Sequence, residues 1–239
     1  MPVMRLDKFF SSQEILSRKE VKACVKDGSI CINGVPAASV EQRVDTQKDC
    51  VSYYGETVEY KPYIYLMLNK PQGVVSSTDD RKNPTVLDLV PPELYRSGLF
   101  PAGRLDKDTV GFVLLTDDGD FAHRILSPKN HIEKTYLARL DGTLTQEGID
   151  LLADGVTLAD GTECMGARVQ VLEDGAEPLV KIVICEGKYH QIKRMFGVLG
   201  LGVNWLKREQ MGGLRLDDNL PEGGCREILH NEVEKILSI

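Results

Sequence analysis

The sequence predicts an α+β protein with two domains, a small one over residues 1–60 and a larger one over residues 61–239. Helix and strand signals follow one another closely in the first part, as a small domain requires. In the larger part, strand-like and helix-like segments do not alternate strictly, which favours a mixed, mostly antiparallel sheet. A hydrophobic content of 42% is ordinary for a chain that buries a substantial core.

In the small domain, a helix is predicted to begin at Ser17, because Ser17 and Glu20 form the S-x-x-E pattern of a capping box. Glycine adopts the left-handed conformation readily, so Gly28 ends this helix. The following Asn33-Gly34 pair predicts a hairpin turn after a short strand at residues 30–32. One helical face is apolar and is formed by Val21, Cys24 and Val25.

A second strand is predicted near residues 50–53, and residues 53–63 form the expected linker. The larger domain begins with an apolar run at residues 64–68, which indicates a buried strand. Further strands are predicted at 112–116, 135–140, 169–172 and 180–185, and helices at 146–153 and 191–199.

The net charge of −7 is unevenly distributed. Residues 1–26 carry six Lys/Arg and three acids, a local charge of +3, and residues 187–208 carry five Lys/Arg and no acid, +5. Residues 141–178 hold nine acids and one arginine, −8. Salt screens charges beyond roughly 8–10 Å, so a basic RNA-binding face is compatible with the negative total. Taken alone, each basic run is better explained as solvated surface than as an RNA-binding face.

The composition contains no metal-site pattern, because the six cysteines are scattered without a CxxC pair and the four histidines lack HExxH spacing. The cysteines are expected to be small apolar core residues. No apolar run reaches 18 residues, and Arg5, Asp7 and Lys8 stand near the start, so neither a transmembrane helix nor a signal peptide is expected. A cytoplasmic monomer without metal or cofactor is the resulting expectation.

Residues 4–55 resemble the S4 RNA-binding module in the segments "MRLDKFF", "SRKE" and "VKDGSICINGVP". The resemblance implies that the basic helical faces contact RNA phosphates. The side chains concerned are Arg5, Lys8, Arg18, Lys19 and Lys22.

Three segments of the larger domain could carry chemistry. Arg104 and Asp106 stand just before an apolar strand and could project from one face, although the spacing alone favours an ion pair at a strand entrance. Tyr136, on a probable strand, could stack on a base. Residues 186–196 join a strand end to a basic helix whose buried face would leave Lys193 and Arg194 free.

Together, "LNKPQG" (68–73), "AGRLDKDTVGFVLLTDDG" (102–119), "HIEKTY" (131–136) and "EGKYHQIKRMF" (186–196) resemble the successive motifs of the pseudouridine synthases. The segments "STDD", "PTVL" and "HRILSPKNH" are similar to the branch of ribosomal small-subunit pseudouridine synthase A. The resemblance implies a catalytic domain of that fold behind an S4-like domain.

The resemblance also implies residue roles. Asp106 matches the essential aspartate, and Arg104 the arginine that helps to hold the RNA. Tyr136 matches the tyrosine that packs against the target base, and Lys193 the basic residue that pairs with the aspartate. Further RNA contacts are expected from Lys134, Lys188 and Arg194.

The implied activity is conversion of a uridine to pseudouridine in ribosomal RNA, most closely 16S RNA during small-subunit maturation, with ribosomal RNA or a precursor particle as partner. Three alternatives stay open. They are a synthase acting on 23S RNA, a non-catalytic RNA-binding assembly factor, and a glycoside hydrolase using paired carboxylates such as Asp106 and Asp117.

Overall fold

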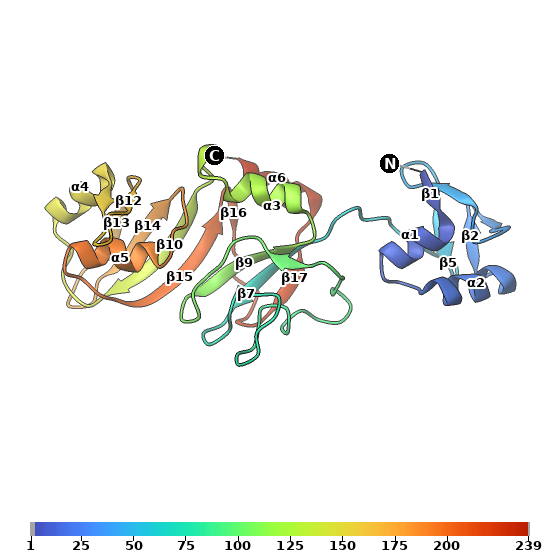
Figure 1. Ribbon diagram of the computed structural model, residues 1–239, viewed down its shortest axis with the longest axis horizontal. Helices are drawn as coiled ribbons and strands as arrows, with labels where there is room; N and C mark the ends of the chain where they lie inside the picture. Colours follow the sequence, from blue (N-terminus) through green and yellow to red (C-terminus); the bar gives the residue numbers. More distant parts are fainter. Residues whose placement is uncertain (1–2, 239) are drawn as a thin grey trace. The chain divides into compact units, whose positions relative to one another are not determined.

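The computed structural model describes residues 3–238, so the outermost residues of the two expected domains (1, 2 and 239) lie outside it. The chain divides into two compact units, one ending at Tyr63 and the other beginning at Ile64 (Figure 1). This division falls at the C-terminal end of the expected linker. Within residues 3–238, no helix is both long and apolar enough to cross a membrane.

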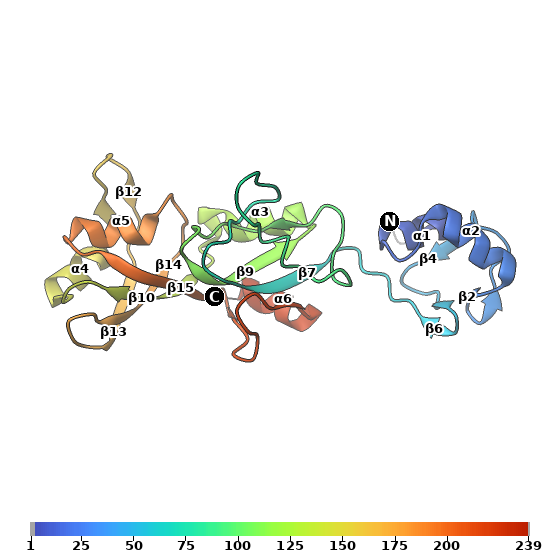
Figure 2. The same ribbon diagram turned by 90° about the horizontal axis from the view of Figure 1, so that it is seen from below.

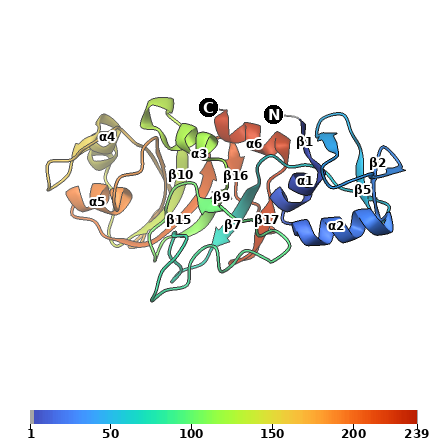
Figure 3. The ribbon, with the colours of Figure 1, turned by 45° about the vertical axis from the view of Figure 1, so that its right-hand side comes forward.

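The first unit packs two helices beside short strands (Figure 3). Strands β3, β2, β5 and β6 form one antiparallel sheet in that order, and β1 pairs with β4. The elements are β1 (Val3–Arg5), α1 (Leu6–Ser12), α2 (Arg18–Asp27), β2 (Ile30–Ile32), β3 (Val35–Pro36), β4 (Arg43–Asp45), β5 (Val51–Tyr53) and β6 (Glu56–Thr57).

The local signals of this unit have the predicted effect. The hydroxyl of Ser17 accepts from the amide of Glu20 (3.3 Å), and the Glu20 carboxylate accepts from the amide of Ser17 (2.7 Å), which completes the capping box. Helix α2 ends at Gly28 with φ 79°. Asn33 and Gly34 have φ 53° and 79°, as the hairpin between β2 and β3 requires.

The second unit is built on one large mixed sheet, with the strand order β13-β14-β10-β15-β9-β7-β17. Strands β9 and β15 run parallel, and the other pairs on this path are antiparallel, which confirms the predicted α+β class. The strands are β7 (Tyr65–Lys70), β8 (Phe100–Pro101), β9 (Val110–Thr116), β10 (Lys134–Leu140), β11 (Val156–Thr157), β12 (Glu163–Cys164), β13 (Arg168–Glu173), β14 (Leu179–Ile184), β15 (Val203–Met211), β16 (Leu214–Arg215) and β17 (Cys225–Glu227).

Two pairs of helices pack against different strands of this sheet (Figures 1 and 2). Helices α4 and α5 lie near β13, β14 and β10, whereas α3 and α6 lie near β9 and β16. The helices are α3 (Gly119–Leu126), a short 3₁₀ turn (Pro128–Asn130), α4 (Gln146–Asp154), α5 (Gln191–Val198) and α6 (His230–Leu237).

Strand β9 contributes to two hydrophobic cores at once. Val113 and Leu115 belong to the core that includes α4 and α5, and Phe112 and Leu114 belong to the core that includes α3 and α6. Successive side chains of a strand point to opposite faces, so both faces of β9 are covered. This explains why the segment is apolar without alternation.

The cysteines only partly fit the expected core role. Cys24 and Cys164 are buried, but Cys50 is exposed and the other three are partly exposed. All six are free thiols.

Candidate active site

Two hollows of about 70 and 380 Å³ share part of their lining beside the turn that precedes β9. Side chains from this turn, from β10 and from the segment between β14 and α5 meet there. Among the residues common to both hollows are Arg104, Asp106, Tyr136, Lys188 and His190. The structure therefore brings together residues that lie up to 86 positions apart (from Arg104 to His190) in the sequence.

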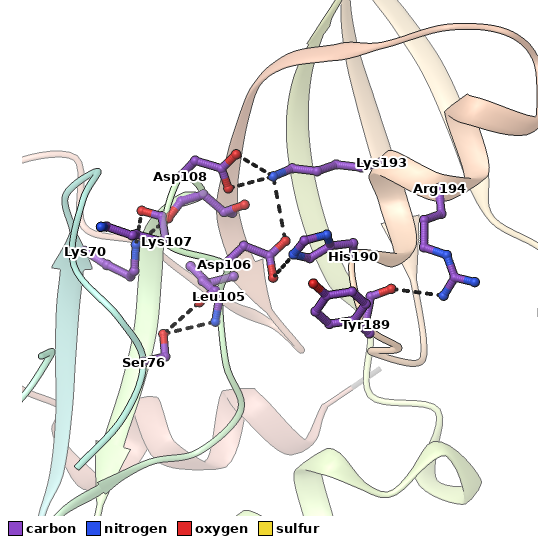
Figure 4. A network of polar contacts seen from close by, with 11 residues as sticks. Lys70, Ser76, Leu105, Asp106, Lys107, Asp108, Tyr189, His190, Lys193 and Arg194 are labelled. Carbon is purple, nitrogen blue, oxygen red and sulfur yellow. Dashed lines mark hydrogen bonds and ion pairs between the residues drawn. The ribbon is translucent and has the colours of Figure 1, made fainter. Parts of the chain in front are cut away.

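The backbone around Asp106 is fixed by two buried side chains. The Ser76 hydroxyl accepts from the amide of Leu105 (3.0 Å) and donates to its carbonyl (3.1 Å). The ammonium of Lys70 donates to the carbonyls of Thr109 (2.7 Å), Pro71 (3.1 Å) and Lys107 (3.3 Å). The turn that carries Asp106 is thus held from both sides (Figure 4).

Lys70 is fully buried, and burial lowers the pKa of its ammonium to about 8, against the opposing influence of the Asp108 and Asp106 charges. The three carbonyl contacts define a structural role for Lys70: its ammonium closes the loop on which the Asp106 carboxylate stands.

Lys193 extends from α5 toward two carboxylates (Figure 4). Its Nζ lies 3.8 Å from Oδ2 of Asp106 and 2.6 and 2.7 Å from the two oxygens of Asp108. The hydrogen bonds from Lys193 hold the pKa of Asp108 below its ordinary value. Lys193 lies near Asp106, as expected. The shortest contacts of Lys193, however, are with Asp108, which sequence reasoning did not single out.

His190 occupies the other side of Asp106. Its Nε2 lies 3.5 Å from Oδ1 of Asp106, so the carboxylate stands between the imidazole and the ammonium of Lys193. His190 precedes α5 in the left-handed conformation (φ 48°), which is uncommon for a residue other than glycine. Sequence reasoning did not single out His190, because its proximity to Asp106 depends on how the chain folds.

Tyr136 is buried on β10 and lines both hollows with Asp106. Beside it lies Arg208, whose Nε donates to the carbonyl of Phe112 (2.7 Å) and whose Nη1 lies 3.5 Å from the Tyr136 hydroxyl. Nη2 of Arg208 has no hydrogen-bond partner among residues 3–238. Arg208 is 2% exposed and was not predicted, because a charged residue in a polar stretch gives no sign of burial.

Lys134 is among the expected RNA-binding residues, but the structure buries it. Its ammonium donates to the carbonyls of Ile132 (2.9 Å) and Cys185 (3.4 Å). Burial, and secondarily the charge of Arg208, lowers its pKa to about 8. Lys134 therefore supports the wall of the larger hollow. The expected contact between Lys134 and an RNA phosphate is wrong, because the side chain is buried.

The remaining expected RNA contacts are accessible to different degrees. Arg104 is exposed at the hollows. Lys188 pairs with Glu186 (2.7 Å) and Arg194 with Asp160 (2.5 Å), so both already have acidic partners. In the first unit the side chains are exposed, and Arg5 also pairs with Asp7 and Glu41; these residues are Arg5, Lys8, Arg18, Lys19 and Lys22.

Asp117 lines neither hollow. It pairs with Arg96 (3.2 Å) and accepts from the amide of Ile64 (2.8 Å). The carboxylate pair considered for a glycoside hydrolase is therefore not assembled. Across residues 3–238 there is also no group of three or more His, Cys, Asp or Glu side chains placed to hold a metal ion.

Comparisons with known proteins show the family to which this chain belongs. The model of the RNA pseudouridylate synthase family matches residues 64–197. A crystal structure described as a pseudouridylate synthase is 38% identical, covers 98% of this chain and 99% of its own, and superimposes with a TM-score of 0.68.

The chain belongs to the RNA pseudouridylate synthase family and is a pseudouridine synthase, an isomerase. It is similar to the uncharacterized RNA pseudouridine synthase YtzG of Bacillus subtilis, with 47% identity over 96% of this chain and 97% of the relative. It is also similar to ribosomal small subunit pseudouridine synthase A of Escherichia coli, with 39% identity over 98% of this chain and 100% of the relative.

Proposed function

We propose that this enzyme converts a specific uridine of 16S ribosomal RNA to pseudouridine during maturation of the small subunit. Full-length similarity to ribosomal small subunit pseudouridine synthase A supports this choice of substrate. The placement of Asp106 between Lys193 and His190, in a hollow lined by Tyr136, carries the proposed chemistry.

The reaction breaks the N1–C1′ bond of uridine, turns the base and joins C5 to C1′, with the C5 proton lost and a proton gained at N1. Asp106 either attacks the sugar at C1′ or removes its C2′ proton, and each role requires an ionised carboxylate. The role proposed for Lys193, whose Nζ lies 3.8 Å from Oδ2 of Asp106, is to place a positive charge beside the reacting carboxylate. Tyr136 would pack against the released base and assist proton removal at C5.

The target nucleotide must leave its helix to reach Asp106, which costs a few kcal/mol of lost stacking and pairing. The larger hollow, about 380 Å³, offers space for the extruded base. Arg104 at its edge would hold the opened RNA. Phosphate contacts are proposed for Lys188 and Arg194, where phosphates would replace the acidic partners, and for Arg5, Lys8, Arg18, Lys19 and Lys22 of the S4-like unit.

The proposal is tested with the Asp106→Asn variant, which keeps the size of the side chain but removes its charge. Tritium release from C5-labelled uridine in 16S RNA or a precursor particle should fall by about 10²–10⁴-fold or more, because the group that starts the reaction is lost. RNA binding should survive in a filter-binding assay. Asp120→Asn, at an exposed position on α3, is the matched control and should keep full activity. Undiminished turnover by Asp106→Asn would overturn the assignment.

The substrate is tested by mapping pseudouridines in ribosomal RNA from cells with and without the gene. Loss of one site in 16S RNA supports the proposal. Loss of a site in 23S RNA assigns the enzyme to the large subunit instead. Unchanged modification together with tight RNA binding would support a non-catalytic assembly factor.

A further inference from the structure

Tyr189 presents an aromatic ring to solvent at the edge of the active site. The residue is 69% exposed, although burying an aromatic ring would remove a large apolar area from water. One face is covered by the imidazole of His190, with ring centroids 3.9 Å apart and planes inclined by 17° (Figure 4). The stack is therefore built on one side and open on the other.

The stack is held by the backbone around it. His190 has the left-handed conformation, φ 48°, which carries an energetic cost for a residue with a side chain. The carbonyl of Tyr189 accepts a hydrogen bond from Nη1 of Arg194 (3.3 Å). The other ring of the stack, His190, reaches Asp106 at 3.5 Å, so the exposed aromatic face is connected to the reacting carboxylate through one side chain.

The surroundings of Tyr189 fit a nucleic acid. Tyr189 lines the larger hollow together with Arg104 and Lys188, two cations that can meet phosphates. Every nucleobase has a π-face, and a single-stranded base that loses its neighbour stacks readily on an aromatic side chain. Extrusion of the target uridine leaves the adjacent base in that condition.

We propose that the open face of Tyr189 stacks on the nucleobase next to the target uridine and that the stack positions His190 against Asp106. This inference rests on the proposed function. Tyr189 is then an RNA-binding residue, and His190 is a positioning residue between the bound RNA and the carboxylate.

The test compares full-length Tyr189→Ala and Tyr189→Phe with the wild type on a 16S RNA fragment that the wild type modifies. Loss of one base–aromatic stack should raise KM by about 5- to 150-fold in Tyr189→Ala while kcat changes less than KM. Tyr189→Phe should behave as the wild type, because the ring is kept. Tyr95→Ala is the matched control, since Tyr95 is also exposed (49%) and lines neither hollow.

An abasic nucleotide beside the target identifies the stacked base. With the wild type, this RNA should raise KM as much as the Tyr189→Ala substitution does. With Tyr189→Ala, it should raise KM no further. The inference would be overturned if the abasic nucleotide and Tyr189→Ala raised KM additively, whichever nucleotide beside the target is abasic. An unchanged KM in Tyr189→Ala would also overturn it.

A binding assay separates failure of this inference from failure of the proposed function. The probe is a single-stranded RNA oligonucleotide with 2-aminopurine next to a uridine. If the wild type forms no pseudouridine, the proposed function fails, and the stack is judged by quenching of the probe. Quenching that is lost in Tyr189→Ala and kept in Tyr95→Ala and Tyr189→Phe supports the platform, and equal quenching by all four proteins refutes it.

Discussion

Asp106 is a partly exposed carboxylate whose two oxygens face different partners, His190 at 3.5 Å and Lys193 at 3.8 Å. Neither distance is a tight hydrogen bond, whereas Lys193 holds Asp108 at 2.6 Å. The carboxylate of Asp106 therefore remains available to a substrate, while Asp108 keeps the ammonium of Lys193 in place.

Replacement of Lys193 by methionine tests this division of roles. The pKa of Asp108 should rise toward its ordinary value, because the hydrogen bonds from Lys193 are the main cause of its lowering. The pKa is measured by ¹³C NMR of labelled aspartate carboxyls. Turnover should fall by about 10²-fold or more, since a preorganised cation beside the reacting group is removed.

Lys82→Met provides the control for that experiment, because Lys82 is exposed in the same unit. Its effect on both the Asp108 resonance and turnover should be negligible. An unchanged Asp108 pKa in Lys193→Met would contradict the role assigned to this ion pair.

Sequence motifs predicted Asp106, Tyr136 and Lys193 as site residues, and all three line the smaller hollow. His190 and Arg208 were not predicted as site residues, because their proximity to Asp106 and Tyr136 depends on how the chain folds. A motif shows which residues recur together, but it does not show which side chains lie behind them.

At the scale of elements, the sequence was informative where local chemistry decides the structure. The capping box of α2 and the turn at Asn33-Gly34 were predicted from residue types alone. Strand β15 was missed, although it pairs with both β9 and β10. Its polar stretch hides the strand pattern, because Arg208 is buried only through its contacts with other strands.

The junction of β9 and β15 depends on Gly111. Gly111 has φ +97°, and an added Cβ would collide with the carbonyl of Arg208 on the neighbouring strand. Gly111→Ala should therefore destabilise the protein by at least about 2 kcal/mol through strain and displaced pairing. The measurement is thermal unfolding, in which Tm should fall by about 4–8 °C.

Gly119→Ala serves as the comparison, because Gly119 has open space around it and an ordinary φ. Its Tm should differ from that of the wild type by no more than about 2 °C, since exposed substitutions of this kind are close to neutral. Equal effects of the two substitutions would show that the close approach at Gly111 is unimportant.

At the scale of the whole molecule, two buried ammonium groups make stability depend on pH. Lys70 and Lys134 each have a pKa of about 8, lowered chiefly by burial from an ordinary value of 10.5. Between these values the unfolded chain binds more protons than the native one, so these lysines make stability rise with pH from about 8 to 10.5. Below pH 8 both states are protonated and this dependence vanishes.

Urea unfolding at several pH values between 7 and about 10 measures this contribution. Each lysine adds up to about 1.4 kcal/mol per pH unit inside its window. Lys134→Met should show a smaller rise with pH than the wild type, whatever its absolute stability. Parallel curves for the two proteins would exclude Lys134 as a source of the dependence.

The position of β9 between two hydrophobic cores has a consequence for inactivation. The turn carrying Asp106 leads directly into a strand whose alternate side chains belong to separate cores. Damage to either core should therefore disturb the same turn, the one that carries Asp106. Substitutions that abolish function should therefore arise in the core on either face of the sheet. Second-site substitutions that restore function should be those that restore packing in the same core.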